Sequence, residues 1–261
     1  MKSILTTVLI ACLVLSCSSD NNSTQEPETN EIPTEHLSGF NLIKQITKNG
    51  IVTNTYEYWE NRKIKIRNWK RDNGNPWVKD SISYENGTVS INLENLQDNS
   101  ITQITFYPTE DGKYIMEYDY GSSYSNEIAT YDVDDSGCGF GSVESRFEST
   151  NDLVDIVTYE YTNTDCSYIE TISRDGTSIF SQKVFKSDGM NSYRKTHFED
   201  IFLNNSIGKG NILELEITTQ QSQSNGTAYT SQFEYNADDF PTYEKRTYED
   251  GSFDEFHYEY Y

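Results

Sequence analysis

The stretch Phe233–Tyr261 reads FEYNADDFPTYEKRTYEDGSFDEFHYEYY, and it contains strands, a proline turn and an Asp-Gly turn. In its last segment the aromatic residues Phe256, Tyr258 and Tyr260 alternate with polar residues. Successive side chains of a strand point to opposite faces, so this period of two predicts one aromatic face and one polar face. Asp250-Gly251 stands between two such runs, and this dipeptide is a strong signal for a tight β-hairpin turn. The stretch therefore predicts consecutive antiparallel hairpin strands.

The same pattern recurs along the chain, where alternating runs are separated by Asn-Gly, Asp-Gly and other polar turns. A spacing of 8–12 residues between short strands is typical of all-β proteins. We expect about fifteen short strands, and before the closing unit they fall at Asn41–Thr47, Ile51–Trp59, Arg62–Trp69, Trp77–Tyr84, Thr88–Leu93, Ile101–Tyr107, Lys113–Tyr120, Glu127–Val133, Val143–Phe147, Leu153–Tyr161, Cys166–Ser173, Thr177–Lys186, Tyr193–Phe202, Asn211–Thr219 and Thr227–Tyr235.

The expected fold class is all-β, because no segment has a convincing helical period. Strands joined by tight turns usually pair with each other, which predicts an antiparallel meander. The meander would form one long twisted sheet or a partly closed barrel. A transmembrane barrel fits poorly, because its outward positions must be apolar, whereas alternate positions here are often Lys, Glu, Asp or Arg.

Composition limits both the core and the partners. Only 34% of the 261 residues are hydrophobic, and 20 Tyr and 12 Phe provide much of the surface that can be buried. A tyrosine buries its ring while its hydroxyl remains in contact with water. The formal net charge of −22 opposes binding to nucleic acid and to anionic lipid headgroups.

The N-terminus has the pattern of a secretory signal. Lys2 precedes an apolar run that is too short to span a membrane, and the run ends at Cys17. This arrangement resembles a bacterial lipoprotein signal, in which the cysteine is lipidated; Cys12 and a plain cleaved signal are the alternatives. We therefore expect a lipoprotein signal peptide at 1–16, a flexible polar tether at 17–36 and an antiparallel β domain at 37–261.

Three resemblances follow from these motifs. The Ser/Asp-rich start of the tether, with Asp20, resembles that of Bacteroidota lipoproteins, which implies an outer-membrane protein displayed on the cell surface. Segments such as Tyr131-Asp132 and Tyr235-Asn236-Ala237-Asp238-Asp239 resemble degenerate tyrosine–aspartate (YD, or RHS-type) hairpin repeats. The chain also resembles uncharacterised Bacteroidota lipoproteins with a porin-like β domain. Neither hairpin resemblance implies a reaction.

Cys138 and Cys166 are the cysteines that remain after processing at Cys17. Disulfides form in the oxidising envelope, so we expect these two to be bridged; two buried free thiols are the alternative. Such a bridge would stabilise the fold by roughly 3–4 kcal/mol in the chain-entropy description.

Asp132, Asp134 and Ser136 match the start of a calcium-binding loop, in which oxygen ligands alternate along the chain before a glycine. Val143 stands where the closing glutamate should be, and hairpin turn chemistry explains the same residues. We therefore expect no metal site and no cofactor.

No catalytic constellation emerges from the 42 acidic residues, and no G-x-S-x-G motif is present. Trp59, Trp69 and Trp77 could stack on sugar rings, although cross-strand aromatic pairing explains them as well. We expect a surface-displayed, non-catalytic binding protein, with an extracellular glycan or an envelope protein as its partner. The alternatives are a structural or assembly protein of the outer envelope and a polysaccharide hydrolase.

Overall fold

The structure is a computed structural model, and it describes residues 41–121, 125–133, 138, 140–162, 165–174, 178–190, 210–220 and 227–261. The chain divides into the units Met1–Glu31 and Ile32–Tyr261, and every described residue belongs to the second unit. The predicted signal peptide, the tether and Cys17 lie outside the described residues, as does the predicted strand Tyr193–Phe202.

The described residues form sixteen β-strands. In chain order they are β1 (Ile43–Lys48), β2 (Ile51–Tyr58), β3 (Ile64–Lys70), β4 (Pro76–Glu85), β5 (Thr88–Asn95), β6 (Ile101–Pro108), β7 (Tyr114–Asp119), β8 (Glu127–Val133), β9 (Phe140–Phe147), β10 (Leu153–Tyr161), β11 (Tyr168–Arg174), β12 (Ser178–Ser187), β13 (Ile212–Gln220), β14 (Tyr229–Tyr235), β15 (Pro241–Tyr248) and β16 (Phe253–Tyr260).

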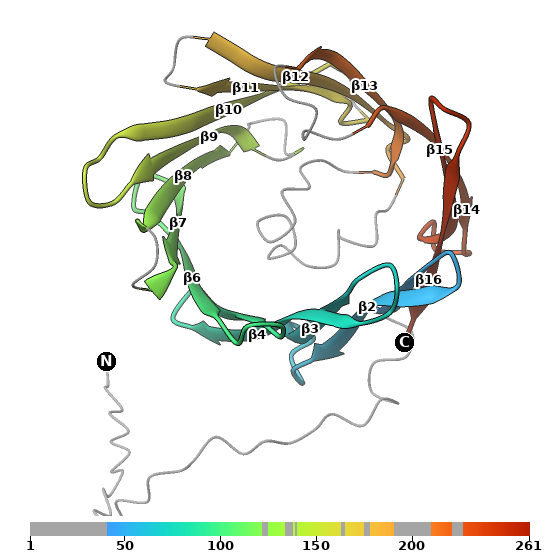
Figure 1. Cartoon of the computed structure of the whole chain (residues 1–261), viewed down its shortest axis with the longest axis horizontal. Coiled ribbons are helices and arrows are strands. Elements are labelled where there is room, and N and C mark those ends of the chain that lie inside the picture. Colours follow the sequence, from blue (N-terminus) through green and yellow to red (C-terminus); the bar gives the residue numbers. More distant parts are fainter. Residues whose placement is uncertain are drawn as a thin grey trace, which may run out of the picture. The chain divides into compact units, whose positions relative to one another are not determined.

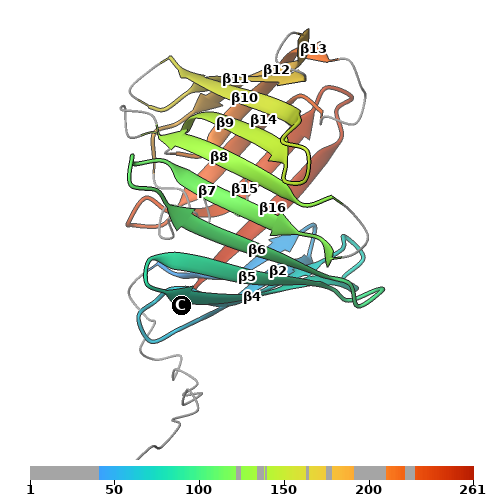
Figure 2. The same cartoon turned by 90° about the vertical axis from the view of Figure 1, so that its left-hand side faces the viewer.

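Each strand pairs antiparallel with the next one in sequence, and β16 pairs back onto β1 to close a barrel. Figure 1 views the ring of strands from one end, and Figure 2 shows the near and far walls crossing at opposite tilts. The predicted all-β meander is confirmed. The sheet is closed, however, because β1 and β16 pair at Ile43↔Tyr260, Ile46↔Tyr258 and Lys48↔Phe256.

Two Asn-Gly turns set the register of their hairpins as predicted, whereas at Asp250-Gly251 only Gly251 has a positive φ angle, of 82°. Asn49 and Gly50 have φ angles of 49° and 80°, and Asn86 and Gly87 have φ angles of 50° and 83°. Positive φ at both central residues is the geometry of the turn whose twist matches a hairpin. Each of these turns therefore joins two strands that pair directly.

The inner wall of the barrel is largely apolar. Across five adjacent strands the register aligns Tyr84, Val89, Phe106, Met116 and Ala129 in one row, and the last four of these are buried. In a closed barrel one face of every strand points to the interior, so this buried row lies inside. It belongs to a continuous hydrophobic core that includes residues of β1–β11 and β16.

One row of the outer wall, across β4–β7, is polar. This row aligns Ser81, Asn92, Gln103 and Asp119, and the last three of these are exposed. This arrangement is the reverse of the apolar-out pattern of a barrel that spans a bilayer. In the part of the chain that the structure describes, no helix has the length and apolar character of a membrane span.

Candidate functional site

The barrel interior contains a cavity of about 310 Å³ beside strands β1–β3 and β13–β16, which we call the interior pocket. Aromatic rings and polar side chains share its wall. The residues that line it are Ile46, Thr53, Asn54, Tyr56, Trp69, Gly210, Asn211, Ile212, Tyr229, Phe233, Glu244, Arg246, Phe256 and Tyr258.

The pairing register explains how distant segments meet in this wall. Trp69 lies opposite Asn54, Asn54 opposite Ile46, and Ile46 opposite Tyr258, which forms one row across β3, β2, β1 and β16. The closure of the barrel therefore places the last strand beside the first three. The pocket depends on this closure.

The first polar cluster fixes Trp69. The Asp80 carboxylate is 1% exposed, and its Oδ2 accepts hydrogen bonds from Arg67 Nε at 2.7 Å and from Trp69 Nε1 at 2.9 Å. The Arg67 guanidinium carbon lies 4.5 Å from the centre of the Trp69 ring, a cation–π arrangement. Held by both contacts, the indole lines the pocket as a fixed wall.

The second polar cluster surrounds Glu244, which is 3% exposed. Ser231 donates a hydrogen bond to its Oε1, and Tyr258 donates one to its Oε2, both at 2.7 Å. Arg246 donates from Nε at 3.0 Å, and its Nη2 lies 2.9 Å from the same Oε1. Both carboxylate oxygens are therefore engaged, and Glu244 is poorly suited to act as a general base.

Two aromatic rings hold the other end of this cluster. The Arg246 guanidinium lies 4.4 Å from the Tyr229 ring centre and 4.8 Å from the Phe256 ring centre. Burial alone would lower the pKa of Arg246, but the Glu244 carboxylate raises it above its ordinary value. Arg246 is therefore a permanent cation with a fixed orientation.

The three predicted tryptophans do not form one platform. Trp69 lines the interior pocket, whereas Trp77, on β4, is 45% exposed and does not line it. Trp59 directly follows β2, at the end of that strand farthest from the Asn49-Gly50 turn. Its Nε1 donates a hydrogen bond to the Ile82 carbonyl at 3.1 Å. Only Trp69 belongs to the pocket.

Sequence reasoning missed Glu244 and Arg246. Along β15 the inward residues Glu244 and Arg246 alternate with Tyr243, Lys245 and Thr247, so both faces of this strand look polar. Without an apolar face, alternation cannot show which side chains are buried. No local signal in the sequence could have found this pair.

Most of the weak calcium candidate lies outside the described residues. Asp132 forms an ion pair with Lys113 at 3.1 Å, while Asp134 and Ser136 lie outside the described residues. Among the residues that were described, no group of three or more His, Cys, Asp or Glu side chains could hold a metal ion.

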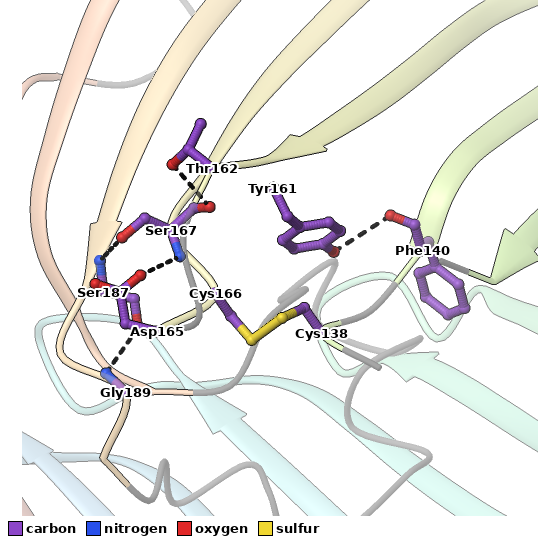
Figure 3. Close-up of a disulfide and its surroundings, with 9 residues drawn as sticks. All are labelled: Cys138, Phe140, Tyr161, Thr162, Asp165, Cys166, Ser167, Ser187 and Gly189. Atoms are coloured by element: carbon purple, nitrogen blue, oxygen red, sulfur yellow. Dashed lines mark hydrogen bonds between the residues drawn. A yellow bond between two sulfur atoms is a disulfide. The ribbon is translucent and has the colours of Figure 1, made fainter. Parts of the chain in front are cut away.

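The predicted disulfide is formed, and it joins Cys138 to Cys166 (Figure 3). It ties the segment between β8 and β9 to the segment between β10 and β11. Beside it, Ser167 accepts a hydrogen bond from the Ser187 backbone N–H at 2.9 Å. The bridge thus fixes one end of the barrel and lies outside the lining of the interior pocket.

No protein-family model matches the chain, and no curated protein matches it in sequence. Among solved structures, the chain is similar to a porin-like protein from Bacteroides uniformis. The two share 9% sequence identity at a TM-score of 0.53, over 80% of this chain and 90% of that protein. At this identity the likeness shows the fold alone, a closed antiparallel β-barrel.

Proposed function

We propose that the protein is an outer-membrane lipoprotein that binds an extracellular glycan, without catalysis, in the interior pocket. The single observation that carries this proposal is the pocket wall, in which fixed aromatic rings stand beside polar donors. Concave sites with apolar walls and a few placed polar groups are typical of small-ligand binding. Sugar rings offer such a site both an apolar face and hydroxyl groups.

The relation to the membrane rests on different observations. The outer wall is polar in the row from Ser81 to Asp119, which favours a barrel held beside the bilayer over one inserted in it. A lipid on Cys17 would supply the attachment, and the tether at 17–36 would give the barrel reach. The porin-like name of its structural neighbour supports an envelope location. Display toward the exterior follows from the resemblance of the tether to Bacteroidota surface lipoproteins.

We propose that the pocket is not catalytic because of how its carboxylate, Glu244, is bonded. Glu244 is the one carboxylate among the described lining residues, and its two oxygens accept bonds from Ser231, Tyr258 and Arg246. Glycoside hydrolysis ordinarily needs two carboxyl groups flanking the bond. The described wall supplies only one carboxyl group, and both of its oxygens already accept hydrogen bonds.

A sedimentation assay tests this proposal. The full-length protein, purified in detergent micelles, is incubated with insoluble polysaccharides; the pellet is assayed for protein and the supernatant for freed sugar. We expect retention without release, and Phe256→Ala should weaken retention by about tenfold or more, a loss of about 1.4 kcal/mol.

Phe253→Ala is the matched control. Phe253 lies on the same strand, but it is 50% exposed and does not line the pocket. Retention should be unchanged in this variant. Freed sugar, or no retention on any polysaccharide, would contradict the proposed function.

A further inference from the structure

Arg246 keeps unused hydrogen-bond donors at the interior pocket. A guanidinium carries five N–H groups, and Glu244 engages only Nε and Nη2. Among the described residues, no other side chain or backbone group hydrogen-bonds to Arg246. Its side chain remains 28% exposed while it lines the cavity. The free edge is thus available to a ligand oxygen.

The two rings prevent this edge from turning away. Tyr229 and Phe256 lie against the guanidinium, and Glu244 holds its other edge. A planar fork fixed in this way loses little conformational entropy when it forms a further hydrogen bond. Arg246 is therefore organised for recognition before any ligand arrives.

The charge around Arg246 determines which kind of ligand oxygen can bind to it. Glu244 lies 2.9 Å from Arg246, so the pair is neutral as a unit. The whole chain has a formal charge of −22, which repels anions approaching from solution. An acidic ligand would thus meet a neutral pair within a negative protein, whereas a hydroxyl or carbonyl oxygen would avoid the repulsion.

We propose that the interior pocket selects uncharged saccharides, and that Arg246 is the residue that recognises them by donating from its free edge to a hydroxyl or carbonyl oxygen. Trp69 and Phe256 provide apolar surface for the sugar ring. A cavity of about 310 Å³ lies at the small end of the range for ligand pockets, which favours a short saccharide. This inference rests on the proposed function and names the ligand class for the same site.

Titration calorimetry on the full-length protein in detergent micelles tests the inference. The probes are neutral trisaccharides of glucose, mannose and galactose, and the trisaccharide of galacturonic acid. We expect at least one neutral trisaccharide to bind at least about tenfold more tightly than the acidic one. Its affinity should change by less than about twofold between about 50 mM and 300 mM NaCl, because no net charge is paired on binding.

The double variant Arg246→Gln/Glu244→Gln removes both charges together, so that neither remains buried without its partner. We expect this variant to bind the neutral trisaccharide at least about tenfold more weakly. The control Lys44→Gln/Glu259→Gln removes an exposed ion pair on the outer wall and should bind as the wild type does. Arg246→Lys keeps the charge beside Glu244 but loses the planar fork, so it should also weaken binding of the neutral trisaccharide. This variant tests the inference if the double variant does not fold.

The outcomes separate the two proposals. Tighter binding of the galacturonic acid trisaccharide, weakened by salt, would overturn the inference and leave glycan binding intact. Unchanged neutral binding in folded variants of Arg246 would likewise overturn it. Failure of every saccharide to bind, together with no retention on polysaccharides, would remove the proposed function itself.

Discussion

Two arcs of the inner wall differ in chemistry. The apolar arc, on β5–β8, presents the buried residues Val89, Ile91, Ile104, Phe106, Met116 and Ala129. The polar arc, on β14 and β15, presents Ser231, Glu244 and Arg246.

Burial in the apolar arc stabilises the fold by roughly 25 cal/mol for each Å² removed from water. Burial in the polar arc costs desolvation, which its hydrogen bonds only partly offset. A wall built for stability alone would not contain the Arg246–Glu244 pair. The contrast therefore teaches that one arc holds the barrel together while the other, with its neighbours β1–β3 and β16, forms the site.

The largest effect is expected where a buried charge loses its partner. Asp80→Ala removes the carboxylate that meets Arg67, whose side chain is 3% exposed. Breaking a buried ion pair costs about 3–5 kcal/mol, so the free energy of unfolding should fall by that amount in urea denaturation. Glu259→Ala, which breaks an exposed pair with Lys44, should cost far less. Equal losses in the two variants would show that burial of the Arg67 pair has no energetic consequence.

Next in size is a cavity in the apolar arc. Met116 is 1% exposed, and Met116→Ala should lower the free energy of unfolding by about 2–5 kcal/mol. Saccharide affinity, measured by the same calorimetry below the unfolding temperature, should be unchanged, because Met116 does not line the pocket. Ile101→Ala, at a side chain that is 55% exposed, should cost less than about 0.5 kcal/mol. A parallel loss of affinity in Met116→Ala would abolish the division into two arcs.

The smallest effect is a dependence of stability on pH at Asp254, on β16. Burial alone would raise the pKa of Asp254, but hydrogen bonds from Tyr248 and Asn49 and the charge of Lys48 together lower it. A carboxyl whose folded pKa is depressed contributes stability above its unfolded pKa and loses it as the pH falls. The difference in unfolding free energy between wild type and Asp254→Asn should therefore be largest near neutral pH, at less than about 1 kcal/mol. It should shrink as the pH falls below about 4, and a difference that grows on acidification would reverse the assignment.

Local patterns in the sequence predicted the strands well. Alternation and turn dipeptides such as Asn49-Gly50 report on neighbouring residues, and those hairpins are formed. The pairing of Ile43 with Tyr260 has no local signal, so the choice between a sheet and a barrel stayed open. The Cys138–Cys166 bridge was predicted from the expected envelope location and the expected processing at Cys17, and it is formed.

The site was mostly beyond prediction for the same reason. Trp69 stood out by residue type, but Trp59 and Trp77 stood out equally and lie elsewhere. Arg246 and Glu244 become a site only when closure brings β15 and β16 beside β1. A pocket made from distant strands has no motif, because its geometry arises from the ring and not from any one segment. The resemblance to tyrosine–aspartate repeats stays a prediction.

The pairing of β1 with β16, which closes the barrel, also constrains how the chain folds. The two strands that close the ring stand at opposite ends of the β domain, so hairpins can form in succession long before the ring closes. Contacts of such large sequence separation are slow to form. Until β16 arrives, β1 retains an unpaired edge that can pair with another chain. Ring closure therefore competes with self-association through the edge of β1 while the chain folds.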